Sequence, residues 1–197
     1  MLIPLRNYSN YSICESNIKI EDLVNFAEKE KLPAMALTDY KLLSGVLEFS
    51  TKCKNKGIQP IIGLDVDFNS KLKHKSRLTF LCKNHIGFKN LNILSTKINT
   101  ENEFHLSLDN INNFSEGNIL ILGGLFSYFQ NLNINTNNLK IILDEITVLK
   151  NIFKNDVFFE FDENLDNKPL NEISKKSKIY RDRLEYELNV IIKMKFS

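Results

Sequence analysis

Tyr8, Tyr40, Asp65 and Gly124 lie in or just after short apolar runs that are typical of buried strands. In α/β folds, the side chains that perform chemistry gather at the carboxyl ends of the strands. We therefore expect these four residues to lie near one rim of a sheet. Asp65 would place a carboxylate at that rim, where it could bind a metal ion or accept hydrogen bonds from charged donors.

The three histidines are not spaced as a ligand cluster. His74 lies in the lysine-rich run KLKHKSR, His85 follows an asparagine turn, and His105 has no acidic or cysteine partner at ligand spacing. Each is therefore interpreted as a surface histidine. The KLKHKSR run could contact a phosphate backbone, but a solvated loop is the favoured interpretation.

Composition sets broad limits on function. The net charge of +2, from 26 basic and 24 acidic residues, gives no whole-chain argument for binding nucleic acid or membranes. Cys14, Cys53 and Cys82 form no CxxC pair, so neither a zinc knuckle nor a redox motif is indicated. No apolar run approaches the ~18 residues of a membrane span, and we expect a cytoplasmic location with reduced thiols. The glycine pair at 123–124 lacks a GxGxxG or Walker context and predicts a tight turn.

Strands and helices alternate along the chain, which predicts an α/β fold around a mostly parallel sheet, open or barrel-like. The second predicted helix is expected to bury Leu43, Val46, Leu47 and Cys53 on one side. Strands are predicted at 2–6, 33–38, 59–68, 77–83, 118–122 and 156–161, and helices at 16–31, after Tyr40 up to Gly57, at 87–98 and at 139–153.

The last twenty residues, KIYRDRLEYELNVIIKMKFS, predict an amphipathic helix that requires a partner surface. Its evidence is two arginine–glutamate pairs at i,i+4 spacing and one apolar stripe. The pairs are Arg181–Glu185 and Arg183–Glu187, and the stripe is Leu184, Leu188 and Ile191.

Several colinear segments resemble the N-terminal PHP (polymerase and histidinol phosphatase) domain of the bacterial DNA polymerase III alpha subunit. They are IPLRNYSNYS, LPAMALTDYKLLSGVLEFS, GIQPIIGLDVDF, LTFLCKNHIGFKNLNILST and NILILGG, within residues 2 to about 161. YRDRLEYELNVIIKMKFS is similar to a later region of that subunit, which leads into the polymerase palm. The resemblance implies an incomplete PHP-type (β/α) barrel-like domain at 1–175, internally shortened, and a helix at 176–197 that is truncated before the palm.

PHP domains that hydrolyse phosphoesters hold several metal ions, which activate a water molecule and neutralise phosphate oxygens. The resemblance places the family's ligand positions on residues that mostly cannot bind a metal, because arginine has no lone pair to donate. The His-x-His falls on Arg6 and Tyr8, the next acid on Glu15, the histidine of Thr-Asp-His on Tyr40, a strand glutamate on Asp65, a further histidine on Arg77 and a cysteine on Gly124.

We therefore expect no cofactor, the alternative being Mn or Zn at a residual site formed by Glu15 and Asp65. One hypothesis is that the former metal pocket has become a structural network of arginines and carboxylates. The alternative is a set of ordinary surface ion pairs, each contributing about 0–1 kcal/mol. Asp39 is interpreted as a turn or cap residue rather than a base.

The resemblance implies a DNA replication protein, from a family of DNA-directed DNA polymerases, which are nucleotidyltransferases. Enzyme activity of this chain is uncertain because it lacks the palm. A metal-free scaffold is the leading interpretation, and the implied partners are the proofreading exonuclease subunit and other replicase subunits, with DNA reached only through the full polymerase and no membrane. The alternatives are a metal-dependent phosphoesterase or 3'-5' exonuclease, and a remnant without function.

Overall fold

The structure is a computed structural model that describes residues 3–72, 75–123 and 136–160. Several expectations fall outside these residues, namely those for Gly124, His74 and the helix at 176–197. The elements are α1 (Ile20–Lys29), β1 (Ala34–Leu37), α2 (Val46–Asn55), β2 (Gln59–Asn69), β3 (Lys75–Cys82), α3 (His85–Thr100), β4 (Leu106–Ser107), the 3-10 helix η1 (Ile111–Phe114), β5 (Asn118–Gly123), α5 (Thr136–Phe153) and β6 (Val157–Glu160).

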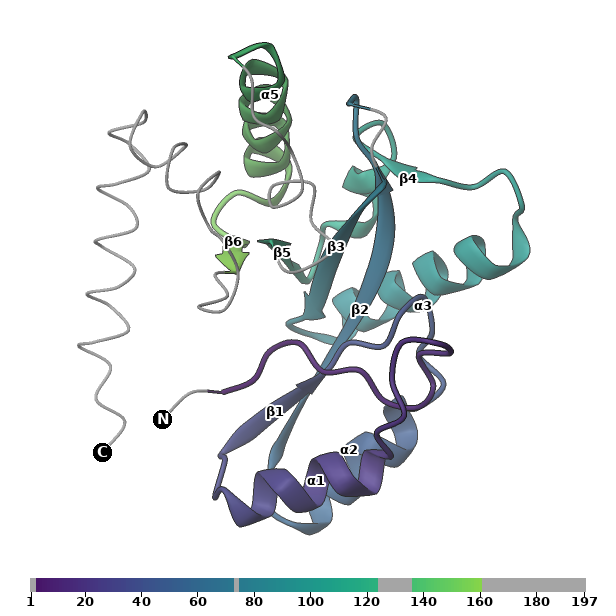
Figure 1. Ribbon diagram of the computed structural model, residues 1–197, viewed down its shortest axis with the longest axis vertical. Coiled ribbons are helices and arrows are strands. Elements are labelled where there is room, and N and C mark those ends of the chain that lie inside the picture. The colour runs from purple at the N-terminus through teal and green to yellow at the C-terminus, as the bar shows by residue number, and fades with distance from the viewer. Residues whose placement is uncertain (1–2, 73–74, 124–135, 161–197) are drawn as a thin grey trace, which may run out of the picture.

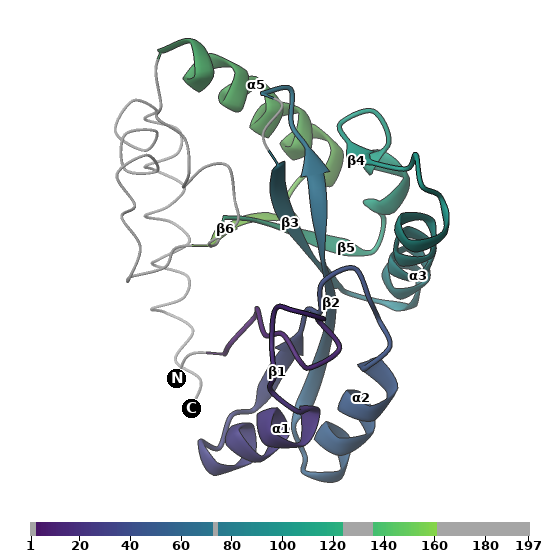
Figure 2. The same cartoon turned by 45° about the vertical axis from the view of Figure 1, so that its right-hand side comes forward.

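The strands form one curled sheet in the order β1-β2-β3-β5-β6, with β4 beside the end of β2 (Figure 1). The pairs β1–β2, β2–β4 and β5–β6 are parallel. Strand β3 runs antiparallel to both of its neighbours, β2 and β5. The predicted α/β class with a barrel-like sheet is confirmed, and β3 is the strand that departs from the expected parallel arrangement. Figure 2 shows α1 and α2 beside the β1 end of this sheet.

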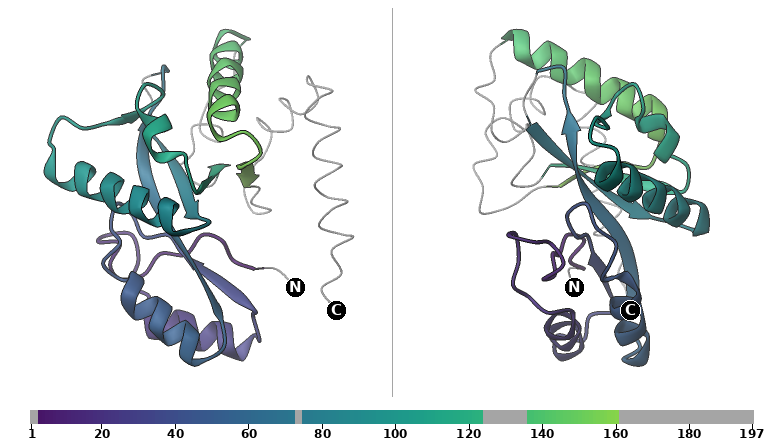
Figure 3. Two further views of the ribbon diagram at one scale, coloured as in Figure 1. Left: turned by 180° about the vertical axis from the view of Figure 1, so that it is seen from behind. Right: turned by 90° about the vertical axis from the view of Figure 1, so that its right-hand side faces the viewer.

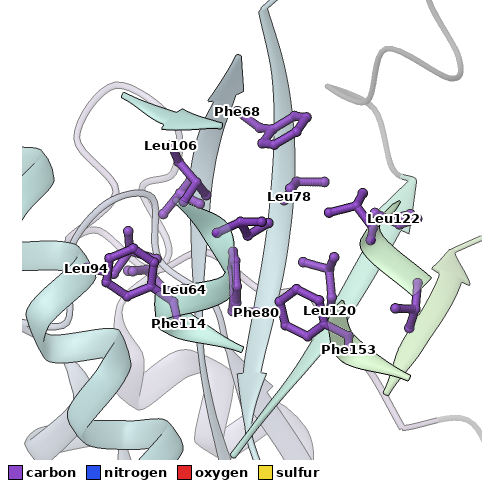
Figure 4. Close-up of a cluster of buried hydrophobic side chains, with 14 of the residues drawn as sticks. Leu64, Phe68, Leu78, Phe80, Leu94, Leu106, Phe114, Leu120, Leu122 and Phe153 are labelled. Carbon is purple, nitrogen blue, oxygen red and sulfur yellow. The ribbon is translucent and has the colours of Figure 1, made fainter. Parts of the chain in front are cut away.

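The main core lies between the sheet and helices α3 and α5. Leu64, Val66 and Phe68 of β2 are fully buried in it, as are Leu78 and Phe80 of β3 (Figure 4). Because successive side chains of a strand point to opposite faces, the residues between them face the other side of the sheet. The alternation of apolar and polar residues in β2 and β3 therefore places a row of charged side chains opposite the core.

A second, smaller core joins α1 and α2 to β1. Ile20, Val24 and Ala27 of α1 face Phe49 and Cys53 of α2. The sequence prediction for α2 was partly wrong, because Leu47 is 79% exposed rather than buried. Leu47 and Phe49 are two residues apart, which places them on different sides of a helix with 3.6 residues per turn. Phe49, which is fully buried, supplies the contact expected of Leu47.

The predicted strand at 2–6 does not form over the described residues 3–6, although this segment runs beside β1. The amide of Ala36 donates to the Pro4 carbonyl at 3.1 Å, and that of Thr38 donates to the Asn7 carbonyl at 2.9 Å. Pro4 has no N–H to return a hydrogen bond, which weakens regular pairing. The segment still covers the outer edge of β1. Within the described part of the chain, no helix is long and apolar enough to cross a membrane.

Candidate functional site

The candidate site is a cluster of charged and phenolic side chains on the face of β2 and β3 opposite the main core. Asp65 pairs with Thr79 across the two strands, and Asp67 pairs with Arg77. Tyr40 follows β1 and forms an isolated parallel bridge with Asp65. This geometry brings the carboxyl end of β1 beside the middle of β2.

Asp65 is fully buried at the centre of the cluster. Its Oδ2 accepts a hydrogen bond from the Tyr8 hydroxyl at 2.7 Å, and its Oδ1 accepts one from Thr79 Oγ1 at 2.8 Å. Burial raises the pKa of the Asp65 carboxyl, although these hydroxyl donors and nearby arginines oppose the shift. Both carboxylate oxygens are therefore already engaged by the protein.

Tyr8 is held as a neutral phenol. Burial raises its pKa far above the usual value, and the negative charge of Asp65 raises it further. A protonated phenol can only keep its hydrogen bond to Asp65 as the donor. Tyr8 therefore contributes a fixed hydrogen bond to the cluster, at the end of the Arg-Asn-Tyr segment that borders β1.

Arg77 connects three acidic residues. Its Nη2 contacts Glu15 Oε1 at 2.6 Å, and its Nη1 lies 3.8 Å from Asp65 Oδ2. Its Nε lies 3.7 Å from Asp67 Oδ1, and the guanidinium carbon lies 3.8 Å from the centroid of the Tyr40 ring. Burial alone would lower the pKa of Arg77, but the Glu15 hydrogen bond and the adjacent carboxylates raise it overall. The residue is therefore permanently charged and makes both ionic and cation–π contacts.

Glu15 reaches the cluster from the loop at residues 8–16, which we call the Tyr-Ser loop. Its side chain is 22% exposed, and the hydrogen bond from Arg77 is the largest cause of its lowered pKa. Asp67 is enclosed in a similar way by Lys41 Nζ at 2.6 Å and the Tyr40 hydroxyl at 2.7 Å. Burial would raise the pKa of Asp67, but these donors and nearby positive charges lower it overall.

Arg6 lies at another part of the site and contacts the far end of the sheet. Its Nη2 donates to the Gly123 carbonyl at 3.1 Å and lies 2.9 Å from Glu160 Oε2. The Arg6 side chain is only 11% exposed. It therefore joins the segment along β1 to the ends of β5 and β6, on the opposite side of the curled sheet. Sequence reasoning did not identify Glu160, because nothing local in the sequence connects it to Arg6.

Asp39, interpreted from the sequence as a turn or cap residue, makes contacts that the sequence pattern did not indicate. It is buried and receives three short hydrogen bonds, from the Ser9 amide at 2.6 Å, Ser9 Oγ at 2.7 Å and Ser12 Oγ at 2.6 Å. Ser12 Oγ in turn accepts from the Tyr40 amide at 3.0 Å. Asp39 thus anchors the whole Tyr-Ser loop that carries Glu15, a larger role than that of a local turn or cap.

The donor set does not fit a divalent cation. Across residues 3–72, 75–123 and 136–160, no group of three or more histidine, cysteine, aspartate or glutamate side chains is arranged to hold a metal ion. The Asp65 oxygens accept hydrogen bonds, Glu15 is bound to Arg77, and Arg6 has no lone pair to offer. His85 and His105 are exposed and begin or precede other elements.

The family assignment follows from comparison with known proteins. The PHP domain family pattern matches residues 4–164, so this chain belongs to the PHP domain family. It is 34% identical over 171 residues to the DNA polymerase III subunit alpha of Chlamydia pneumoniae, covering 80% of this chain and 14% of that protein. It is 31% identical over 174 residues to the subunit alpha of Borreliella burgdorferi, covering 80% of this chain and 15% of that one. The chain thus spans about one seventh of the length of these relatives, and the resemblance to the PHP domain of the alpha subunit is confirmed.

A solved structure supports the fold alone. An amidohydrolase from Chromobacterium violaceum superposes with a TM-score of 0.56 at 12% sequence identity, covering 93% of this chain and 84% of that one. At this level of identity, the likeness shows a shared barrel-type architecture and leaves the chemistry of the site to its own residues.

Proposed function

We propose that this PHP domain is a metal-independent structural module of a replicative DNA polymerase alpha subunit. Two findings support the proposal. The chain is 31–38% identical to alpha subunits over 114 to 174 residues. The main support for a metal-independent role is the position of the Arg77 guanidinium, which lies among Glu15, Asp65 and Asp67.

The guanidinium replaces the electrostatic role of a cation without supplying its chemistry. Three carboxylates close together repel one another unless positive charge is placed between them. Arg77 provides that charge, through a hydrogen bond to Glu15 and ion pairs with Asp65 and Asp67. It cannot accept a water molecule as a ligand and activate it, so this site should hold three chain segments together and hydrolyse nothing.

The partners proposed for the module are inferred from its relatives, the alpha subunits. We propose that it contacts the proofreading exonuclease subunit and other replicase subunits, and that it meets DNA only as part of the full polymerase. The chain should not synthesise DNA by itself. A cytoplasmic location belongs to this proposal as well.

The test compares thermal unfolding with catalysis in the purified chain. The wild-type chain should show the same midpoint of unfolding with EDTA, Mn²⁺ or Zn²⁺, and no turnover of a phosphodiester substrate above a buffer blank. The variant Arg77→Met should unfold at a lower temperature under all three conditions, while Lys19→Met, which removes an exposed lysine, should not. A metal-dependent rise in the wild-type midpoint together with turnover would contradict the proposal.

A further inference from the structure

A groove lies between α2 and α3, and none of the residues that line it belongs to the arginine–carboxylate cluster. Figures 2 and 3 show α3 above α2 on the same flank of β2. Two adjoining hollows of about 480 and 400 Å³ make up the groove, and they share Ser50, Gln59 and Pro60 in their walls. We call this feature the α2–α3 groove.

The floor of the α2–α3 groove is apolar. Pro60 and Ile62 of β2 and Ile58, which directly precedes β2, form this floor. Phe88 of α3 lies at one end of it. Strand β3 pairs with β2 from Gly63 onward, so the first residues of β2 have β1 on one side and the groove on the other. The groove therefore exists because β3 ends before it reaches the start of β2.

The charged side chains at the rim of the groove are lysines. Lys54, Lys83 and His85 line the two hollows, and no aspartate or glutamate does. The neighbouring lysines of α2 are engaged elsewhere, since Lys52 pairs with Glu21 and Glu48, and Lys56 pairs with Glu28. Lys54 has no acidic partner within the described part of the chain, while Lys83 contacts Asp156 at 2.8 Å.

Two exposed apolar side chains extend this surface. Leu47 of α2 is 79% exposed and follows Val46 of the groove wall, and Ile86 of α3 is 46% exposed and follows His85. Large apolar side chains at the border of a hollow are typical of a surface that binds another protein.

We propose that the α2–α3 groove binds an extended peptide segment of a partner protein, in which acidic side chains alternate with large apolar ones. The apolar residues would fill the floor, and the acidic residues would meet Lys54 and the rim. A nucleic acid fits less well, because a phosphate backbone needs a longer track of cations and gains little from an aliphatic floor. The proposal does not depend on the state of the arginine–carboxylate cluster, which lies on another face.

The probe is a fluorescein-labelled twelve-residue peptide with alternating Asp or Glu and Leu or Phe, titrated with the full 197-residue chain and followed by fluorescence anisotropy. We expect saturable binding that weakens at least tenfold when lysine replaces each acidic residue, or serine each apolar one. Lys54→Glu should weaken binding by about tenfold, which corresponds to about 1.4 kcal/mol. Ser50→Arg, which fills the shared wall, should also weaken it.

The matched control is Lys19→Glu, which makes the same charge change at the exposed N-cap residue of α1, outside the groove lining. Its affinity should equal that of the wild type, and circular dichroism should show all variants folded. Equal weakening by Lys19→Glu and Lys54→Glu would overturn the proposal, as would retained affinity in Ser50→Arg. Preferential binding of a labelled single-stranded oligonucleotide, lost in Lys54→Glu, would also overturn it in favour of a nucleic-acid site.

Discussion

Arg77 is the residue on which the structural account of the site depends. Replacing it with methionine leaves Asp65 buried near Glu15 and Asp67 without their shared cation. Removing one partner of a buried ion pair lowers the free energy of unfolding by about 3–5 kcal/mol, and by somewhat less where the site is partly exposed. We expect Arg77→Met to lower the free energy of unfolding by about 2–4 kcal/mol, measured by urea denaturation.

Arg77→Lys separates charge from geometry. Lysine keeps the positive charge but cannot present a planar fork or cover the Tyr40 ring in the same way. It should recover only part of the stability lost in Arg77→Met. Complete recovery would show that charge alone holds the cluster together, and no recovery would point to the shape of the guanidinium.

Asp39 should matter as much as Arg77 for stability, although the sequence indicated only a turn or cap residue. Asp39→Ala leaves the hydroxyls of Ser9 and Ser12 and the Ser9 amide without their buried acceptor. We expect a loss of about 3 kcal/mol in the free energy of unfolding. Asp109→Ala, at an exposed aspartate, should change it by less than about 0.5 kcal/mol. Equal effects of the two variants in urea denaturation would refute the anchoring role.

Glu15 gives the cluster a dependence on pH in the acid range. Its pKa is lowered in the folded chain, so its contact with Arg77 stabilises the fold fully above the ordinary glutamate value of 4.5. That contribution is lost as the pH falls through the lowered folded pKa. The stability difference between wild type and Glu15→Gln should therefore be largest near neutral pH and should shrink below about pH 4. A difference that stays constant across urea titrations from pH 7 to 3 would contradict this reading of the pair.

At the scale of elements, local pattern predicted much of the fold. The alternation in β2 and the helical spacing in α3 and α5 are strong signals, and these elements formed where they were expected. Local pattern could not predict that β3 is antiparallel, that β4 pairs with β2, or that Arg6 reaches Glu160. Each of these depends on which distant segments become neighbours.

The candidate site could also be predicted from the sequence only in part. Tyr8, Tyr40 and Asp65 share one rim, as the strand pattern and the resemblance led us to expect. The buried partners Ser9 and Ser12 of Asp39 could have been noticed, because two serines at three-residue spacing in a tyrosine-rich loop are natural hydrogen-bond donors. Their burial, however, follows only from the packing of that loop against β1.

The start of α3 provides an element-scale prediction. Asn84 caps the helix by accepting from the Gly87 amide at 3.0 Å. A Cβ added to Gly87 would lie 2.6 Å from Asn118 Oδ1 and even closer to the Gly117 carbonyl, so the helix is held tightly against the turn before β5. We expect Gly87→Ala to lower the free energy of unfolding by about 1–3 kcal/mol.

The control for Gly87→Ala is Lys89→Ala, at an exposed position in the same helix. Alanine favours the helix at both positions, so propensity alone would stabilise each variant or leave it unchanged. Thermal unfolding should show a lower midpoint for Gly87→Ala only. An unchanged midpoint would mean that α3 can shift away from the turn at little cost.

At the scale of the whole molecule, the described chain is a curled sheet with one polar face and two apolar cores. Arg6 and Arg77 pair with different acidic residues, Glu160 and Glu15, and neither lines the α2–α3 groove. The chain spans about one seventh of the length of its alpha-subunit relatives.

The measurement that tests this account most directly is the metal content of the purified chain. The protein would be produced in medium supplemented with Mn²⁺ and Zn²⁺, passed through gel filtration without chelator, and analysed by inductively coupled plasma mass spectrometry. We predict far less than one equivalent of any transition metal per chain, in wild type and Arg77→Met alike. A stoichiometric metal in the wild type that is lost in a Glu15→Gln, Asp65→Asn double variant would contradict the account, because it would place a working metal site where we find an arginine–carboxylate network.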